Sequence, residues 1–410
     1  MKRSFVLKLP QLELCLKDLS QRTFRLDLFR CSLNGILEVG FNVFVILIAI
    51  RFLDASQSFK SLLAAGSAFG FFLMPWTSKL SAILEKPVTH IAGFIMLICS
   101  LSLIFCSQVE SILPYTVCLL VAQISLSQMP GLMIHVYSSN YNSSNRGRSV
   151  SWNFIFASSI GMIFSYLFGV FLDQYGIHYH FLFLGMGLLA LSSSVVLFFI
   201  PSTKLENSKS SSNLLGGLSY IYKDRLFGKM LLGWMLMGLG VIMTIPLRIE
   251  YVAGGSGMGM NNKQIAILFG ISMLSGVLTS RIWGKLFDQI SFVPYRMGLN
   301  LFLLFSIIIF FSSTTFWGLA VGAILGGVAT GGASIAWSLW VMKIAPDGRE
   351  TDYMGAHVFM TGIRGALAPF LGYFVLELVG FKGVTYCSSF LILISVLIFL
   401  SEIKSPRLSV

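Results

Sequence analysis

The stretch Asn207-Ser-Lys-Ser-Ser-Ser-Asn213 is a polar segment near the middle of a chain that is otherwise rich in apolar residues. It lies within residues 201–227, whose composition is that of a linker and whose second half, 214–226, predicts a short helix at a membrane surface. Six long apolar runs precede this linker and six follow it. The sequence therefore divides into two halves with the same number of apolar runs.

Each apolar run is close to the roughly 20 residues that a helix needs to cross the hydrocarbon core of a membrane. We therefore predict twelve transmembrane helices, at 31–53, 59–80, 88–108, 112–137, 149–173, 178–200, 228–251, 262–286, 293–312, 315–342, 354–379 and 383–402.

The composition excludes a soluble protein. Of the 410 residues, 55% are hydrophobic and 11% are charged, and the mean hydropathy is +0.81. This apolar content exceeds what a globular core can hide, so lipid must surround much of it. The net charge of +12 comes from basic residues scattered between the apolar runs, which favours topology signals over a nucleic-acid partner. We predict an all-α membrane protein.

The basic residues also predict the orientation. If residue 1 is cytoplasmic, 23 of the 29 Lys and Arg residues fall on the cytoplasmic side and five on the other side. We therefore expect a multi-pass protein of a cytoplasmic (inner) membrane with both termini in the cytoplasm. Residues 1–30 lack the apolar core of a secretory signal and predict an amphipathic lead-in, and residues 403–410 predict a cytoplasmic tail.

A short motif follows the eighth predicted helix. The stretch Ser280-Arg-Ile-Trp-Gly-Lys-Leu-Phe-Asp-Gln-Ile-Ser291 contains Gly284 and Asp288. It resembles the loop signature G-x-x-x-D-R between the eighth and ninth helices of the major facilitator superfamily of transporters, with Gln289 at the position of the usual Arg. Asn145-Arg-Gly-Arg148 resembles the basic loop before the family's fifth helix, and residues 362–372 resemble its Gly- and Pro-rich eleventh helix.

A weak internal repeat agrees with this resemblance. A shift of 204 residues aligns Gly161 with Gly365, Asp173 with Glu377, and Gly176 with Gly380. Two departures stand beside it. Residues 75–87 lack the Gly and Asp of the sister loop, and residues 158–161 lack the Gly-Pro pair of the family's drug–proton antiporters.

The resemblance implies two pseudo-symmetric bundles of six helices, residues 31–200 and 228–402, which alternately open a central cavity to either side. It also implies a gate in which Asp288, with Gly284, lies against the start of the fifth helix and pairs with Arg146 or Arg148. The alternative is that Asp288 is a solvated loop acid.

Two charged residues lie deep in predicted membrane helices, where charge is costly and usually marks a substrate or ion path. Glu38 shares one face of the first helix with Asn34 and Asn42, at i−4 and i+4. Arg364 lies in the eleventh helix, seven residues after His357. For both groups the alternative is a buried polar bond that fixes helix packing.

Further candidates for solute contact rest on the resemblance, which makes the first, fourth, seventh and tenth helices line the cavity. Gln123 and Ser127 are one turn apart in the fourth helix, Trp234 lies in the seventh and Trp337 in the tenth. The tryptophans could instead anchor the helices at the membrane interface.

The resemblance, together with Glu38, predicts a secondary active transporter that moves a small organic solute by alternating access, with protons as the coupling ion. A facilitator or uniporter without ion coupling is the nearest alternative. A non-transporting sensor or a membrane-embedded enzyme on the same fold is the other. We expect a monomer, and the residues leave the substrate and the direction open.

The sequence lacks the motifs of catalysis, of nucleotide hydrolysis and of zinc binding, and its six Cys residues have no paired spacing. We therefore predict neither an enzyme nor a resident metal or cofactor.

Overall fold

The computed structural model of the protein describes residues 9–141, 143–204, 216–254, 258–346 and 349–408. Over these residues the chain is helical, without a strand and with one isolated bridge between Pro87 and Lys204. Ten helical stretches of this described part are long and apolar enough to cross a membrane. The predicted all-α membrane fold is confirmed at this level.

The helices of the first half follow the predicted apolar runs. In chain order they are α1 (Leu9–Val39), the π-helix η1 (Gly40–Phe44), α2 (Val45–Arg51), α3 (Gln57–Ile83), α4 (Val88–Cys106), α5 (Ile112–Ser127), α6 (Met129–Asn140), α7 (Ser143–Tyr175), the 3₁₀ helix η2 (Gly176–His178) and α8 (His180–Phe199). The pairs α1–α2 and α5–α6 each form one continuous apolar stretch.

The helices of the second half are η3 (Gly216–Leu218), α9 (Ser219–Lys223), α10 (Arg225–Ile242), α11 (Thr244–Ala253), α12 (Asn262–Gln289), α13 (Phe292–Ser312), α14 (Phe316–Leu339), η4 (Trp340–Lys343), α15 (Glu350–Ser401) and η5 (Pro406–Leu408). Within α15, Gly380 has φ 67° and ψ −175°, so two helices meet there at a kink. Glycine is the residue that adopts this backbone conformation without strain. The kink lies between the predicted helices 354–379 and 383–402.

Two predicted boundaries are wrong. The lead-in and the first span are not separate elements, because α1 runs without a break from Leu9 to Val39. The fifth span begins earlier than predicted, because α7 starts at Ser143. Arg146 and Arg148 therefore lie inside the first turns of α7, and not upstream of it as the sequence suggested. Polar residues continue both helices beyond their apolar parts, which is why hydropathy misses these ends.

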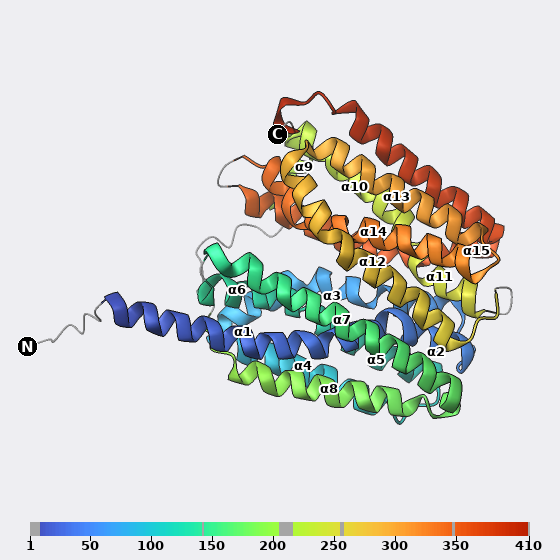
Figure 1. Ribbon diagram of the computed structural model, residues 1–410, viewed down its shortest axis with the longest axis horizontal. Coiled ribbons are helices and arrows are strands. Elements are labelled where there is room, and N and C mark those ends of the chain that lie inside the picture. Colours follow the sequence, from blue (N-terminus) through green and yellow to red (C-terminus); the bar gives the residue numbers. More distant parts are fainter. Residues whose placement is uncertain (1–8, 142, 205–215, 255–257, 347–348, 409–410) are drawn as a thin grey trace, which may run out of the picture.

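Most of the extensive helix contacts join helices of the same half, such as α4 with α8 and α1 with α7, or α12 with α14 and α10 with α15. Figure 1 shows the helices of the first half, coloured blue to green, grouped beside those of the second half, coloured yellow to red. The most extensive pairings between the halves are α7 with α12 and α3 with α15, and α11 also contacts α2 and α3. These pairings hold the halves together.

Small residues allow the helices to approach closely, as they often do in membrane proteins. A Cβ atom at Gly35 of α1 would lie 2.2 Å from the carbonyl oxygen of Ala157 on α7, so only glycine fits there. Across the halves, a Cβ at Gly169 of α7 would lie 2.8 Å from the Cβ of Ala266 on α12. The contact between the halves is therefore close on this side of the molecule.

Candidate functional site

Glu38 and Asn42 form an accessible polar strip on the first membrane helix. Every residue from Leu33 to Ala49 is buried except these two, whose side chains are exposed. Glu38 nevertheless lies deep among protein atoms, as a side chain on a cavity wall does. An acid facing lipid is strongly disfavoured, which makes Glu38 a candidate for a polar path through the protein.

The backbone at this strip is unusual. Glu38 lies in the last turn of α1, and Asn42 lies within the π-helix η1 that follows. Single turns of π-helix inside α-helices are rare and frequently occur at functional sites. The wider turn changes the direction of the side chains that follow it. It therefore helps to decide which polar groups face the accessible space.

Asn34 does not share this strip, although it was predicted on the same face. Its side chain is buried, and its Oδ1 accepts a hydrogen bond of 2.9 Å from Ser193 Oγ on α8. Asn34 thus connects α1 to α8.

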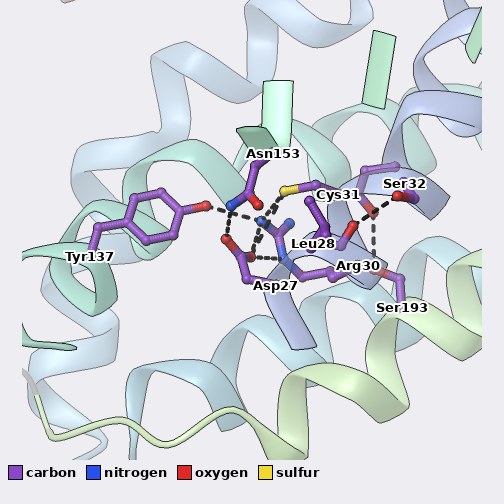
Figure 2. A network of polar contacts seen from close by, with 9 residues as sticks. Asp27, Leu28, Arg30, Cys31, Ser32, Tyr137, Asn153 and Ser193 are labelled. Carbon is purple, nitrogen blue, oxygen red and sulfur yellow. Dashed lines mark hydrogen bonds and ion pairs between the residues drawn. The ribbon is translucent and has the colours of Figure 1, made fainter. Parts of the chain in front are cut away.

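A buried ionic network lies on α1 at Asp27 and Arg30, which precede Glu38 in the chain (Figure 2). Arg30 donates from Nε to Asp27 Oδ1 at 2.8 Å, and from Nη2 to the hydroxyl of Tyr137 on α6 at 3.3 Å. Asn153 on α7 donates to the other carboxylate oxygen of Asp27. Acid and base are matched here, and the network connects three helices. This network was not predicted, because residues 1–30 were expected to form a cytoplasmic lead-in. The i, i+3 spacing of Asp27 and Arg30 is the signal for it in the sequence.

Gln123 and Ser127 on α5 are buried and lie against α3. Gln123 donates from Nε2 to the carbonyl oxygen of Leu63 at 3.1 Å and accepts a bond from Ser67 Oγ at 3.4 Å. Ser127 donates to the carbonyl oxygen of Ile124 on its own helix. Their present contacts are those of helix packing.

The candidates of the second half come together around Trp234 on α10. Arg364 donates from Nη1 to the carbonyl oxygen of Trp234 at 2.8 Å. The ring of His357 lies 5.3 Å from the Trp234 ring and 5.7 Å from that of Trp337. Trp234, His357 and Arg364 are buried, whereas Trp337 is partly accessible. The predicted polar stripe of α15 is therefore an internal cluster.

Arg296 on α13 belongs to the same cluster and was not predicted. It is fully buried, and its guanidinium carbon lies 4.0 Å from the centre of the Trp234 ring. From the sequence, Arg296 counts among the cytoplasmic basic residues, because it is close to the predicted start of the ninth helix. The helix begins at Phe292, one residue from the predicted start, and it is the direction of the Arg296 side chain that places it within the protein.

Polar contacts between the two halves gather at one end of the molecule, here called the Arg51 end. Arg51 at the end of α2 donates to Asn262 Oδ1 at 2.5 Å and to the carbonyl oxygen of Met260. Lys60 on α3 forms a salt bridge of 2.9 Å with Glu250 on α11. These contacts connect the halves directly.

Asp173, at the end of α7, completes the Arg51 end. Its two carboxylate oxygens accept the backbone N–H groups of Asn262 and Lys263, at 2.8 and 2.9 Å. A carboxylate is favourable at a helix start, where N–H groups are unpaired and carry partial positive charge. The sequence predicted this type of contact for Asp288 at the start of the fifth helix. The structure shows its mirror image, with an acid of the fifth span at the start of the eighth.

The predicted gate lies at the opposite end. Asp288 is exposed near the end of α12, one turn after the partly buried Gly284. The side chains of Arg146 and Arg148 lie outside the described residues, so their pairing with Asp288 stays a prediction. Asp224 at this end accepts hydrogen bonds from Arg407, which also belongs to the second half. Partial burial raises the pKa of Asp224, but its hydrogen bonds and the charge of Arg407 outweigh burial, so the pKa is lowered.

The geometry is that of a membrane protein whose two helical halves enclose polar groups and make their polar contacts at one end. Residues 138–315 match the family model of the Major Facilitator Superfamily. No curated protein matches the chain.

Solved transporters have the same fold. The nucleoside transporter NupG superposes with a TM-score of 0.71 at 14% identity, over 94% of this chain and 98% of that one. A mutant of NupG gives 0.73 at the same identity, over 94% and 100%. A bacterial homologue of the human lysosomal transporter Spinster, inward-facing and occupied, gives 0.61 at 13% identity, over 97% and 98%. The predicted resemblance to the major facilitator superfamily is confirmed by the match over residues 138–315, and these transporters share the fold of this chain.

Proposed function

We propose that the protein is a twelve-helix secondary transporter made of two pseudo-symmetric bundles, residues 31–200 and 228–402. The ten apolar stretches support this number, because α3 adds a helix of 27 residues and Gly380 divides α15 into two. The linker 201–227 joins the bundles, and its residues 205–215 lie outside the described part. The protein acts as a monomer in a cytoplasmic membrane with both termini inside.

In this proposal the Arg51 end is the external end, as the count of Lys and Arg residues predicts. The contacts of Arg51, Lys60 and Asp173 then close the protein to the outside. At the other end, α7 and α12 carry mostly exposed residues, among them Trp152 and Ile282. The conformation is that of a transporter open to the cytoplasm. A reporter fused after Asn145 should be cytoplasmic, and one fused after Gly254 should be external.

The observation that carries the function is the accessible pair Glu38 and Asn42 between otherwise buried neighbours. A carboxylate in a cavity can take up a proton on one side and release it on the other when the bundles move. Glu38 is therefore the proton-carrying group, and a small organic solute is the cargo. The likeness to NupG makes nucleosides the first panel of solutes to test.

The variant Glu38→Gln tests this role, because glutamine keeps the shape and polarity but cannot release a proton. Purified protein is placed in proteoliposomes, and labelled solutes are followed with and without a pH gradient. We expect the variant to exchange solute without a gradient and to lose at least tenfold of gradient-driven accumulation. The matched control is Glu110→Gln, which removes an exposed acid of the loop between α4 and α5 and should change neither quantity.

Each alternative gives its own result. Full accumulation by Glu38→Gln would assign coupling to another group. Exchange by the parent protein without accumulation under any gradient would identify a facilitator. Absence of any solute movement in the parent, for a panel wider than nucleosides, would favour a sensor.

A further inference from the structure

Four polar residues of the second half form a buried group that we call the cation cluster: Arg296, His357, Thr361 and Arg364. Arg296 and Arg364 approach Trp234 from two directions, one over the ring and one at the carbonyl oxygen. His357 and Thr361 are on the same helix as Arg364, two turns and one turn before it, respectively. Three tryptophans surround His357, since the Trp340 ring lies 5.1 Å from it, beside Trp234 and Trp337.

The hydrogen-bonding groups of this cluster are mostly unused. Among the residues that the structure describes, thirteen buried side-chain nitrogen or oxygen atoms have no partner, and seven of them are here. They are Nε and Nη1 of Arg296, Nε of Arg364, both ring nitrogens of His357, Oγ1 of Thr361 and Nε1 of Trp340. Native proteins leave few buried polar groups unpaired. Seven unpaired polar atoms in one place indicate a binding site whose ligand would supply the missing hydrogen-bond partners.

The unused groups specify what completes it. The arginine and tryptophan nitrogens are all donors, so the missing partner must accept hydrogen bonds. Two guanidinium groups share the cluster, and no described carboxylate contacts either of them or His357. An unpaired buried charge is costly in a protein, and more so within a membrane. The missing partner is therefore an anion, and an oxyanion fits the planar arrangement of guanidinium donors.

The cluster also lies next to the contact between the two halves. Gly365, adjacent to Arg364 on α15, packs against Ala68 of α3, and Gly362 faces Phe72 of the same helix. Trp337, the accessible member of the tryptophan ring, lies between the cluster and the space outside it. A ligand bound to Arg364 would thus act on the helix that forms the contact between the halves.

We propose that the cation cluster binds the oxyanion group, a carboxylate or phosphate, of the solute that this protein moves. The transport of that solute rests on the function proposed above, whereas the binding of an oxyanion does not. The anionic group of the solute then lies on Arg296 and Arg364, beside the contact of α15 with α3 of the other half.

Binding is measured on the purified full chain in detergent, without transport. The probes are benzoate, its neutral analogue benzamide, and inorganic phosphate. The readouts are the melting temperature and the tryptophan fluorescence, because three of the seven tryptophans border the cluster. The variants are Arg364→Gln and Arg296→Gln. The matched control is Arg248→Gln, which removes an arginine of α11 that is bonded to Ser306 outside the cluster.

We expect benzoate to raise the melting temperature and change the fluorescence in a saturable manner, and benzamide to do neither. Both cluster variants should bind benzoate at least tenfold more weakly, while Arg248→Gln binds as the parent does. Without ligand, the cluster variants should melt no lower than the parent, since each loses an unpaired buried charge. That last result separates a ligand site from a structural one.

Equal responses to benzoate and benzamide, or undiminished benzoate binding in Arg364→Gln, would overturn the proposal. So would cluster variants that melt well below the parent without ligand. Saturation by phosphate that benzoate cannot displace would assign the cluster to a free inorganic anion and overturn the solute assignment. If the protein binds benzoate but moves no solute, the result supports the oxyanion site and contradicts the proposed transport function.

Discussion

The two halves each contain a buried polar cluster on their membrane helices, and the two clusters differ in one respect. In the first half, Arg30 is paired with Asp27, and the same carboxylate is also bonded to Asn153 (Figure 2). In the second half, Arg296 and Arg364 have no carboxylate among the described residues, and Nε and Nη1 of Arg296 and Nε of Arg364 have no partner. One cluster is complete within the protein, and the other is not.

The difference separates structure from binding. A buried ion pair with satisfied hydrogen bonds fixes the helices that it joins, and breaking it leaves an uncompensated charge. A buried group of cations without an acid weakens the protein that contains it, unless a ligand supplies the charge. The first half shows the same contrast on a single helix, where Asp27 is paired and buried and Glu38 is accessible.

The largest expected effect follows from breaking the complete cluster. Asp27→Asn leaves Arg30 buried without its counter-charge, and we expect it to lower the free energy of unfolding by about 3–5 kcal/mol. Unfolding titrations with SDS in mixed micelles measure this change. The double variant Asp27→Asn with Arg30→Met is the control and should recover at least half of the loss. A loss below about 1 kcal/mol for Asp27→Asn would show that the two clusters do not differ in this way.

The second effect concerns the two ends of the molecule. Lys60→Met removes the salt bridge to Glu250 and should weaken the present conformation by about 1–2 kcal/mol relative to the opposite one, because the pair is only partly buried. Asp288→Asn should instead weaken the opposite conformation, and so favour the present one, by a similar amount. The reason is that it loses the proposed contacts of Asp288 with a helix start and with Arg146 or Arg148.

Cysteine labelling from each side of the membrane, or distances between spin labels on the two halves, measures this equilibrium. Opposite shifts for the two variants would support a gate at each end. An unchanged distance distribution in Asp288→Asn would leave Asp288 as a loop acid, and the same result in Lys60→Met would remove the Arg51 end as a closing element.

The third effect has the opposite sign to the first. Arg296→Met removes an unpaired buried cation and fills its space, so we expect unfolding to become harder by about 1 kcal/mol in the absence of ligand. The contact with the Trp234 ring is lost as well, which limits the gain. SDS titration again provides the measurement. A loss of 3 kcal/mol or more, comparable to that of Asp27→Asn, would mean that Arg296 has a counter-charge after all.

Much of the fold could be predicted from the sequence, because membrane thickness sets a minimum length for each apolar run. Glu38 could also be predicted, since an acid inside such a run is conspicuous. Asp27 could not, because it lies close to a helix end that hydropathy does not locate. Arg296 could not, because the start of its helix is predicted to within one residue but the direction of its side chain into the protein does not follow from hydropathy.

Side-chain direction is the other part that spacing does not determine. Asn34, Glu38 and Asn42 follow one another at intervals of four, yet only the last two are accessible. The partner of Asp173 was equally out of reach. The partner of Asp173 depends on which helix starts lie beside the end of α7 in this conformation. In the opposite conformation, closed at the other end, the family pattern assigns the contact with a helix start to Asp288.

The smallest effect comes from an acid–base pair outside the membrane spans. Asp224 accepts hydrogen bonds from Arg407 and from the backbone N–H of Phe227, and its pKa is lowered in the folded protein, against the effect of its partial burial. A lowered pKa contributes stability that is complete above the ordinary aspartate value of about 3.9 and is lost as the pH falls through the lowered value.

Asp224→Asn keeps a good helix cap and removes only the charge. Because Arg407 is 43% exposed, we expect a loss of about 0.5 kcal/mol at pH 7, and a smaller loss at a pH below the ordinary aspartate value. Unfolding titrations at the two pH values measure this, with Arg407→Gln as the matched variant. A loss at pH 7 as large as that of Asp27→Asn would show that burial is not what makes the first-half cluster strong.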